Sequence, residues 1–218
     1  MDINKYIEEK YKVDLEQKMP IKLGISRFKG FIEILREAGF KVGAEIGVAT
    51  GRYSKWLCAG IPDLKLFLVD PYTAYSEYVE HHDDEGQKIL NDCYVKAQER
   101  VAKYNCEFVR KPSMDALKDF NDNSLDFVFI DGNHSFQYVV NDIAEWSKKV
   151  KPGGIVAGHD FWRSTQVSSL YVDGLSPREK VKLCQVKDAV EGWTYANQIK
   201  PWFVATNDKC PAWFYVKR

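Results

Sequence analysis

The chain has 218 residues, 45% of them hydrophobic, and its 31 Lys and Arg residues match its 31 Asp and Glu residues. This zero formal net charge, without a basic stretch, argues against long duplex nucleic acid as a partner. No apolar run approaches the roughly 20 residues of a membrane-spanning helix. Because a chain of this length supports one sizeable core, we expect a single domain over residues 1–218.

The five cysteines lie far apart in the sequence, and no two of them form a Cys-x-x-Cys pair. Their odd number and wide spacing argue against both a disulfide framework and a structural zinc site. The first residues are polar and favour a helix, unlike a secretory leader. We therefore expect an unprocessed protein of the reducing cytoplasm. The cysteines are Cys58, Cys93, Cys106, Cys184 and Cys210.

Residues 1–40 are expected to form an N-terminal helical segment, in which residues 25–38 carry the apolar spacing of one buried helix face and Gly39 ends the helix. From residue 43 onward, short β-rich runs alternate with helical patterns. We expect strands at residues 43–46, 66–69, 106–110, 125–130 and 154–157, and helices at residues 53–59, 87–104, 114–120, 136–150 and 186–198. This alternation predicts an α/β fold with a parallel sheet covered by helices on both faces.

The end of the chain departs from that alternation. Two β-rich runs, residues 202–206 and 212–216, are separated by Asn-Asp-Lys-Cys-Pro, which predicts a hairpin. A dinucleotide-binding dehydrogenase normally finishes its sheet with another parallel strand, so the hairpin favours a different nucleoside-cofactor fold. We expect a doubly wound, mostly parallel seven-stranded sheet with a C-terminal antiparallel hairpin.

Two irregular segments, residues 71–86 and 161–180, follow the carboxyl ends of strands, where open α/β sheets place ligands. We expect them to be active-site loops. Their aromatic residues either form a wall around the substrate or a lid that packs on the edge of the sheet. The run from His81 to Asp84 is interpreted as solvated surface. The aromatic residues are Tyr72, Tyr75, Tyr78, Trp162 and Tyr171.

The most informative segment reads Gly-Ala-Glu-Ile-Gly-Val-Ala-Thr-Gly over residues 43–51. Its small residues leave backbone amides open to a ligand, and the next helix offers its positive N-terminal end. The following strand closes with Asp70, a carboxylate able to accept hydrogen bonds from both hydroxyls of a ribose. The segment at residues 43–51 and Asp70 together predict a nucleoside-containing cofactor.

Further motifs narrow this prediction. They are Phe-Ile-Asp-Gly-Asn-His-Ser-Phe from Phe129, Asp142, Trp146, and Lys-Pro-Gly-Gly-Ile-Val-Ala-Gly-His-Asp from Lys151 to Asp160. With the terminal hairpin, they resemble class I S-adenosylmethionine-dependent methyltransferases, which have a Rossmann-like fold, and within them the small-molecule O-methyltransferases related to macrocin and catechol O-methyltransferases. The resemblance covers roughly residues 39–218. Ala49 replaces the middle glycine of the family turn, and the Gly-x-Gly-x-x-Gly spacing of nicotinamide enzymes is missing.

The resemblance implies that Glu45 and the turn at residues 47–51 face the methionine part of the cofactor, Asp70 the ribose, and Ser113 with Met114 the adenine. Each has a plainer alternative. Glu45 caps local backbone amides, Asp70 starts the turn at Pro71, and Ser113 caps a helix, alone or in addition. The full cofactor-binding set implied is Glu45, Gly47, Ala49, Thr50, Gly51, Ser54, Asp70, Pro71, Ser113, Met114 and Asp131.

The resemblance also implies a divalent metal site formed by Asp131, His159 and Asp160, with His134 as the general base where the catechol enzymes use lysine. A metal-bound hydroxyl loses its proton more easily, and histidine accepts a proton at neutral pH. Because magnesium prefers oxygen, His159 is either an orienting neighbour or a ligand that favours manganese, iron or zinc. Without metal, Asp131 hydrogen-bonds the cofactor or substrate, His134 holds a loop, and His159 is a satisfied strand-end histidine.

We therefore expect an S-adenosylmethionine-dependent methyltransferase that methylates a hydroxyl of a small molecule, assisted by Mg²⁺ or another divalent ion. The alternatives are a metal-independent O- or N-methyltransferase and a non-catalytic S-adenosylmethionine-binding protein. An RNA-modifying enzyme is disfavoured by the zero net charge, and a membrane partner is not expected. The residues select neither an acceptor nor an oligomeric state, so a homo-oligomer stays an open alternative.

Overall fold

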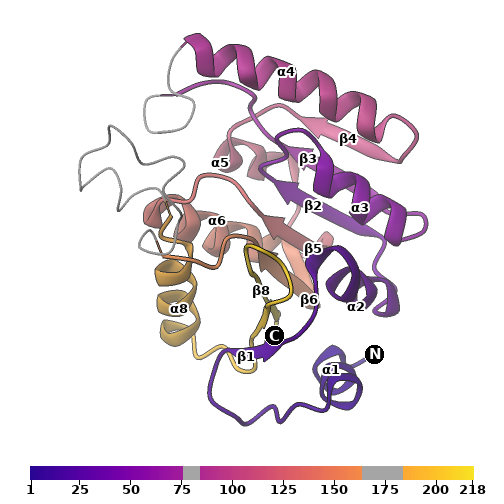
Figure 1. Cartoon of the computed structure of the whole chain (residues 1–218), viewed down its shortest axis with the longest axis vertical. Coiled ribbons are helices and arrows are strands. Elements are labelled where there is room, and N and C mark those ends of the chain that lie inside the picture. The colour runs from indigo at the N-terminus through magenta and orange to yellow at the C-terminus, as the bar shows by residue number, and fades with distance from the viewer. Residues whose placement is uncertain (76–83, 164–183) are drawn as a thin grey trace.

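A twisted eight-stranded sheet runs through the middle of the molecule (Figure 1). The computed structural model describes residues 1–75, 84–163 and 184–218. Half of the loop expected at residues 71–86 and most of the loop expected at residues 161–180 therefore lie outside the described residues, together with Tyr78, Tyr171 and the run from His81 to Asp83.

The strand order is β1-β7-β8-β6-β5-β2-β3-β4, and within it only β8 runs antiparallel to its neighbours β6 and β7. The mostly parallel sheet with a C-terminal antiparallel hairpin is thus confirmed. The strands are β1 Ile21–Leu23, β2 Val42–Ile46, β3 Lys65–Val69, β4 Cys106–Val109, β5 Leu125–Ile130, β6 Val150–Gly158, β7 Phe203–Ala205 and β8 Ala212–Val216.

The sheet has one strand more than the seven expected. The additional strand, β1, pairs in parallel with β7 at the edge of the sheet. It contains three residues, of which Ile21 and Leu23 are buried and Lys22 is exposed. Three alternating residues are too few to indicate a strand in a sequence. The segment forms a strand because it pairs with β7.

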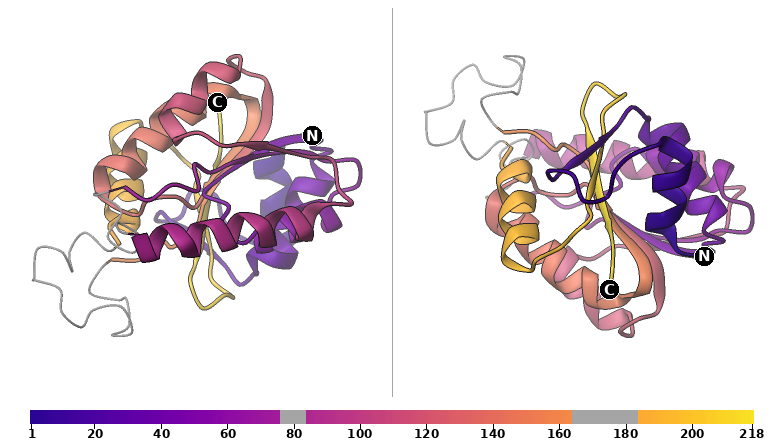
Figure 2. Two further views of the ribbon diagram at one scale, coloured as in Figure 1. Left: turned by 90° about the horizontal axis from the view of Figure 1, so that it is seen from above. Right: turned by 90° about the horizontal axis from the view of Figure 1, so that it is seen from below.

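Helices cover both faces of the sheet, as expected (Figure 2). Residues of α1, α2, α3 and α4 pack in one apolar cluster with one face of the strands, and residues of α5, α6 and α8 pack in a second cluster with the other face. The helices are α1 Ile3–Tyr11, α2 Ile32–Glu37, α3 Arg52–Gly60, α4 Asp84–Val101, α5 Ser113–Ala116, α6 Phe136–Lys149 and α8 Val186–Ala196.

The central strand β5 shows why the sheet needs both layers. Phe127 and Phe129 point into the first cluster, whereas Val128 and Ile130 point into the second. Successive side chains of a strand alternate between faces, so a strand buried on both sides is an unbroken apolar run. Residues 127–130 of β5 form such a run.

The helix expected at residues 25–38 begins differently from an α-helix. Residues Arg27–Phe31 form one π-helical turn, η1, which leads directly into α2. Ser26 caps η1 by accepting a hydrogen bond from the amide of Phe28 at 3.1 Å, and Gly39 follows α2 with a φ of 75°. Single π-helical turns occur frequently at functional sites, and this one carries Arg27.

Three strands bring their carboxyl ends to the same place. The amide of Asp131 donates to the carbonyl of Ile46 at 2.7 Å, and the amide of His159 donates to the carbonyl of Ile130 at 3.0 Å. These bonds extend the pairing of β5 with β2 and β6 just beyond the strands. The residues that follow these strands are therefore held side by side.

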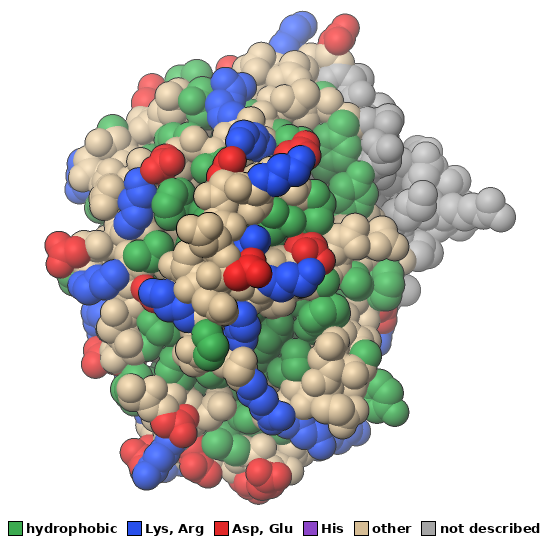
Figure 3. Space-filling model, turned by 180° about the vertical axis from the view of Figure 1, so that it is seen from behind, with side chains coloured by type: hydrophobic (Ala, Val, Ile, Leu, Met, Phe, Trp, Pro, Cys, Tyr) green, Lys and Arg blue, Asp and Glu red, His purple; other side chains and the backbone are tan. Residues whose placement is uncertain are grey.

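The outer surface carries charges of both signs. Lys and Arg side chains lie among Asp and Glu side chains on the face shown in Figure 3, in keeping with the equal numbers of the two kinds. In the described part of the chain, none of the helices joins sufficient length with the apolar character that crossing a bilayer demands.

Candidate functional site

The turn at residues 47–51, called the glycine turn below, links β2 to α3 in a conformation that suits small residues. Gly47 has a φ of 84°, and a Cβ atom there would collide with the carbonyl of Asp131. Gly51 caps α3 with a φ of 67°, and Ala49 is also left-handed, with a φ of 46°. Since alanine adopts this region only at some cost, the turn depends on the hydrogen bonds around it.

Asp70 supplies those hydrogen bonds. Its Oδ2 accepts from the amides of Val48 and Ala49 at 2.9 and 3.1 Å, and its Oδ1 accepts from the amide of Tyr72 at 2.8 Å. The alternative in which Asp70 organises the turn after Pro71 is therefore present in the structure. The same carboxylate also fixes the glycine turn, which the sequence did not indicate.

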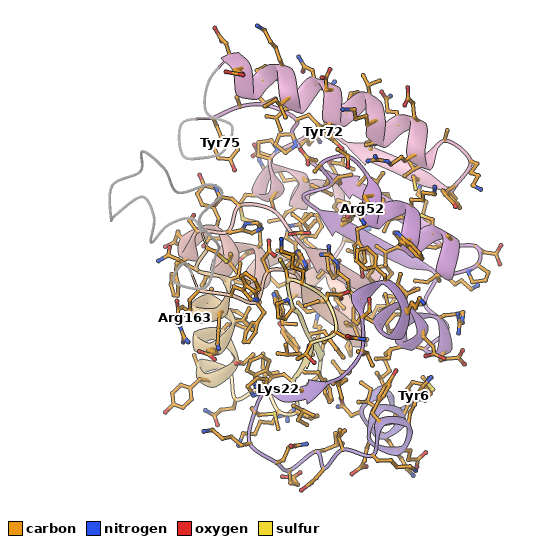
Figure 4. All side chains as sticks on the ribbon, in the orientation of Figure 1. Tyr6, Lys22, Arg52, Tyr72, Tyr75 and Arg163 are labelled. Carbon is orange, nitrogen blue, oxygen red and sulfur yellow. The ribbon has the colours of Figure 1, made fainter. Side chains whose placement is uncertain are left out.

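Tyr72 and Tyr75 come from the segment that follows β3 but have different surroundings (Figure 4). Tyr72 is 1% exposed, donates its hydroxyl to the carbonyl of Ala49 at 3.0 Å and packs on the ring of Tyr94. It therefore does not form part of a substrate-facing wall. The hydroxyl of Tyr75 accepts from the amide group of Asn133 at 3.2 Å, beside the end of β5.

Glu45 and Ser54 form a buried pair beneath the glycine turn. The hydroxyl of Ser54 donates to Glu45 Oε2 at 2.5 Å, and both residues are almost fully buried. Burial raises the pKa of Glu45 to about 8, because a charged carboxylate loses hydration there. Among the described residues, Glu45 therefore accepts from a hydroxyl and not from the backbone amides of the alternative. In the glycine turn above this pair, the carbonyl of Thr50 accepts a hydrogen bond from Arg100 at 2.6 Å.

Ser113 does not cap a helix through its side chain, since Pro112 occupies the cap position of α5. Its hydroxyl contacts a carboxylate oxygen of Asp142 and accepts a hydrogen bond from the indole of Trp146 at 2.7 Å. Burial raises the pKa of Asp142 to about 7. Met114 is partly buried against the second apolar cluster.

Four side chains from the ends of β5 and β6 come together as the sequence predicted, and we call Asp131, His134, His159 and Asp160 the charge cluster. His134 Nε2 lies 3.4 Å from Asp131 Oδ1 and 3.4 Å from Asp160 Oδ2. The histidine therefore lies between the two carboxylates. The carbonyl of His134 accepts from the amide of Gln185 at 2.8 Å, which ties this corner to the segment before α8.

His159 uses both of its ring nitrogens. Nδ1 lies 3.1 Å from Asp160 Oδ1 and 3.5 Å from Asp131 Oδ2, while Nε2 lies 3.1 Å from the carbonyl of Cys210. A carbonyl only accepts, so Nε2 carries a proton. Burial by itself lowers the pKa of His159, but Asp131 and Asp160 outweigh it and raise the pKa to about 9.

The carboxylates show the reciprocal effect. Burial tends to raise the pKa of Asp131, yet His159 and His134 hold it well below its usual range. Burial also tends to raise the pKa of Asp160. The hydrogen bond from His159 acts in the opposite direction, and the pKa of Asp160 is lowered overall. Both acids are therefore charged at neutral pH, and His159 balances part of that charge.

Two residues at this site carried no signal in the sequence. The Nη1 atom of Arg27, in η1, lies 3.7 Å from Asp131 Oδ2. The connection between β7 and β8 brings Cys210 to His159 and Asp160, with ligand atoms within 4.8 Å of one another. Arg27 lies outside the motifs that carried the resemblance, and Cys210 had no second cysteine or histidine nearby in the sequence. Only the folded chain reveals them.

The donor atoms of this site fit a divalent ion. In the described residues, Asp131, His134 and Asp160 form one group of ligand atoms that all lie within 4.8 Å of one another, and His159, Asp160 and Cys210 form another. The expected set of Asp131, His159 and Asp160 is not one of these two groups, but His159 Nδ1 lies 3.5 Å from Asp131 Oδ2 and 3.1 Å from Asp160 Oδ1. Mixed carboxylate and imidazole donors suit manganese, iron or zinc better than magnesium.

Comparison with known proteins places the chain among methyltransferases. A family model described as a methyltransferase domain matches residues 44–161, more than half of the chain. A relative from Sinorhizobium fredii, the uncharacterized protein y4gI, is 27% identical over 126 residues, which cover 55% of this chain. The match spans only 12% of that longer protein.

Two solved structures share the fold over nearly the whole chain. The O-methyltransferase TomG of Streptomyces achromogenes, solved with S-adenosylmethionine, has a TM-score of 0.59 at 18% identity and covers 100% of this chain and 90% of its own. An O-methyltransferase of Bacillus cereus, solved with S-adenosylhomocysteine, has a TM-score of 0.57 at 15% identity and covers 99% of this chain and 89% of its own.

Proposed function

Because the chain belongs to this methyltransferase family, we propose that it transfers a methyl group from S-adenosylmethionine to a hydroxyl of a small molecule, assisted by a divalent ion. One observation carries the proposal: the glycine turn packs against the main chain of Asp131, the first member of the charge cluster. A methyl donor on the turn and an acceptor at the cluster are then neighbours. Methyl transfer requires this proximity.

The cofactor side of the proposed site is formed by β2, the glycine turn and the end of β3. Glu45, Ser54 and the turn residues Gly47, Ala49, Thr50 and Gly51 are assigned to the methionine part. S-adenosylmethionine, when bound, supplies the methyl group from its sulfonium centre. The N-terminal end of α3, which follows Gly51, favours the negative carboxylate of the methionine part.

Asp70 is assigned to the ribose, with Pro71 beside it. A carboxylate offers about four lone-pair sites, and the amides of Val48, Ala49 and Tyr72 already occupy three of them. Binding both ribose hydroxyls therefore requires at least one of these three amides to release Asp70. Ribose binding and the conformation of the turn are coupled through this one side chain.

The adenine is assigned to the start of α5. The hydroxyl of Ser113 already has partners in Asp142 and Trp146, so we assign the adenine contact to the main chain at Ser113 and to the side chain of Met114. The buried network behind Ser113 holds α5 against α6. It thereby fixes the position of the start of α5, where the adenine is assigned.

Asp131, Asp160 and His159 are assigned as the residues that hold the divalent ion, whose chemistry is to lower the pKa of an acceptor hydroxyl. The carboxylates provide two negative charges on neighbouring strands. His159 keeps its orientation through Nε2 and the carbonyl of Cys210, the arrangement usual for a ligating histidine. Its Nδ1 then faces the two carboxylates.

His134 is assigned as the general base. Its Nε2 reaches the region between Asp131 and Asp160, and a neutral imidazole accepts a proton at physiological pH. The same nitrogen also belongs to a group of atoms able to bind metal. The metal content of a variant distinguishes the two roles. Removal of a base leaves the metal content unchanged, whereas removal of a metal ligand lowers it.

A metal-independent mechanism has one specific observation in its favour. Arg27 and a protonated His159 together provide two positive charges opposite the two carboxylates of Asp131 and Asp160. The charge cluster is thus already close to neutral. A divalent ion must displace the Nδ1 proton of His159 to bind there.

One assay separates these possibilities. The purified protein is incubated with methyl-labelled S-adenosylmethionine and a panel of hydroxylated molecules, amines and RNA, with and without EDTA. We expect label in a hydroxylated small molecule, loss of transfer in EDTA and recovery on adding Mn²⁺, Mg²⁺ or Zn²⁺. Undiminished transfer in EDTA selects the metal-independent mechanism, and label in an amine selects N-methylation.

Two further outcomes contradict the proposal more broadly. Label in RNA would replace the small-molecule acceptor, and binding of S-adenosylmethionine without transfer to any acceptor would identify a non-catalytic binding protein. Asp131→Asn is the inactive control, because it removes a charge that both mechanisms use.

The remaining expectations are proposals of the same kind. We propose that residues 1–218 act as one methyltransferase domain, since both apolar clusters share the one sheet. The five cysteines are unpaired in the structure, which supports the proposal of a reducing, cytoplasmic location. The interspersed surface charges support a function without nucleic acid (Figure 3).

A further inference from the structure

Arg27 is anchored at the edge of the charge cluster by the opposite end of the chain. Asp208, in the connection between β7 and β8, accepts from the hydroxyl of Ser26 at 2.7 Å and from the amide of Arg27 at 2.6 Å. The start of η1 is therefore fixed by a residue 181 positions away in the sequence. A surface arginine does not need such support.

The side chain of Arg27 is also held in place. Its guanidinium lies 4.7 Å from the ring centre of Phe28 and 5.2 Å from that of Tyr53. The side chain is only 16% exposed. Contacts of a guanidinium with aromatic faces restrict its plane, so the donors of Arg27 have a set direction toward the cluster.

Two of those donor atoms have no acceptor among the described residues. The Nε and Nη1 atoms are buried, and within residues 1–75, 84–163 and 184–218 they have no hydrogen-bond partner. The 3.7 Å between Nη1 and Asp131 Oδ2 is too long for a hydrogen bond. Buried donors without partners are costly, which suggests that a ligand supplies the missing acceptors.

The chemistry of the missing acceptor follows from the guanidinium. A planar fork of N–H donors matches a carboxylate or a phosphate, which accept two hydrogen bonds at once. Asp131 does not fill this role, because it already faces His134 and His159. The positive charge of Arg27 also offsets part of the repulsion between the two carboxylates of the cluster and an acidic acceptor.

We propose that Arg27 binds an anionic group of the acceptor, so that the substrates are hydroxylated carboxylic acids or phosphate esters and not neutral alcohols or phenols. This inference rests on the proposed function and specifies its substrate class. Arg27 lies outside residues 44–161, the part matched by the family model. It therefore serves the choice of acceptor and not the chemistry common to the family.

The test uses acceptors in matched pairs. Salicylate and protocatechuate are each compared with their amides, and catechol monophosphate with catechol, which separates the carboxylate from the phosphate. Methyl transfer is measured for the wild type, Arg27→Gln and Arg27→Lys, and binding to the protein saturated with S-adenosylhomocysteine is measured by calorimetry. Arg52→Gln is the matched control, because Arg52 contacts the same Phe28 ring at 5.8 Å but is exposed (Figure 4).

We expect the wild type to prefer the acid of at least one pair, by about 10- to 100-fold in kcat/KM, the usual value of a charge-assisted hydrogen bond. Arg27→Gln should remove that preference through KM, Arg27→Lys should restore part of it, and Arg52→Gln should leave it unchanged. Thermal unfolding checks that each variant is folded.

Several results overturn the inference. They are equal use of acid and amide by the wild type, an equal loss for both in Arg27→Gln, and the absence of measurable affinity for every acid and the phosphate. The proposed function fails separately, when S-adenosylmethionine is not bound or no methyl group is transferred. Transfer to neutral acceptors alone therefore contradicts the role of Arg27 and leaves the methyltransferase proposal intact.

Discussion

The cofactor side of the site is held by main-chain amides that donate to one carboxylate, whereas the acceptor side is held by contacts between charged side chains. Asp70 secures the glycine turn through amides that lie within one βαβ unit. Asp131 instead faces His134, His159 and Arg27, which come from three separate segments. The first arrangement suits a cofactor common to a family, and the second suits an acceptor that differs between its members.

We expect the largest effect on activity from a substitution of His134, on the acceptor side of the site. Replacement by alanine should lower kcat by about 100- to 10,000-fold, the usual contribution of a general base, without changing the affinity for S-adenosylmethionine. The measurements are turnover of the acceptor found by the labelling assay and a calorimetric titration with the cofactor. Equal loss of cofactor affinity would show that the two sides are not separable.

Metal content gives this variant a second readout. His134→Ala should keep the metal stoichiometry of the wild type if His134 is a base, and His134→Gln, which keeps a polar group of similar reach, serves as its matched comparison. A metal-free His134→Ala protein would identify His134 as a ligand and remove the assignment as base.

A substitution of Asp70, on the cofactor side, should lower cofactor affinity and leave kcat almost unchanged, the reverse of His134→Ala. Asp70→Asn should weaken binding of S-adenosylmethionine by about 10- to 100-fold, because hydrogen bonds to a charged acceptor are lost from both the ribose and the glycine turn. The kcat at saturating cofactor should change little. Asp92→Asn, an exposed residue of α4, is the control. Unchanged affinity in Asp70→Asn would contradict the ribose assignment.

The smallest effect concerns the buried acid beneath the glycine turn. The pKa of Glu45 is raised by burial from its usual 4.5 to about 8, so the neutral form contributes stability that is fully present below pH 4.5 and is lost as the pH rises through 8. Glutamine mimics the neutral form. The difference in melting temperature between Glu45→Gln and the wild type should therefore increase by a few degrees as the pH increases from 4.5 to about 8, because only the wild type loses stability.

The control for that measurement is Glu99→Gln, an exposed residue of α4. Its melting temperature should stay parallel to that of the wild type at every pH. A constant difference between Glu45→Gln and the wild type would mean that Glu45 titrates like an exposed acid in the folded protein.

The two sides also differ in how far the sequence predicts them. The strands, the hairpin and the position of Asp70 follow from local patterns of apolar residues and turns, because each pattern lies within a short stretch of chain. The meeting of Asp131, His134, His159 and Asp160 follows from the rule that parallel strands share one carboxyl edge.

What the sequence did not predict depends on contacts between distant segments. Strand β1 exists as a strand because β7 lies beside it, and Tyr72 is buried because Tyr94 of α4 covers it. Arg27 reaches the charge cluster because Asp208 holds η1 from the far end of the chain. No local pattern encodes such pairings, so they come only from the folded structure.

We propose above all that the glycine turn and Asp70 bind S-adenosylmethionine beside the charge cluster. This binding is measured by a calorimetric titration of the wild type with S-adenosylmethionine, repeated with Asp70→Asn and His134→Ala. We expect saturable one-to-one binding by the wild type, weaker binding by Asp70→Asn and wild-type binding by His134→Ala. No saturable binding by the folded wild type, or equal loss in both variants, would contradict this proposal.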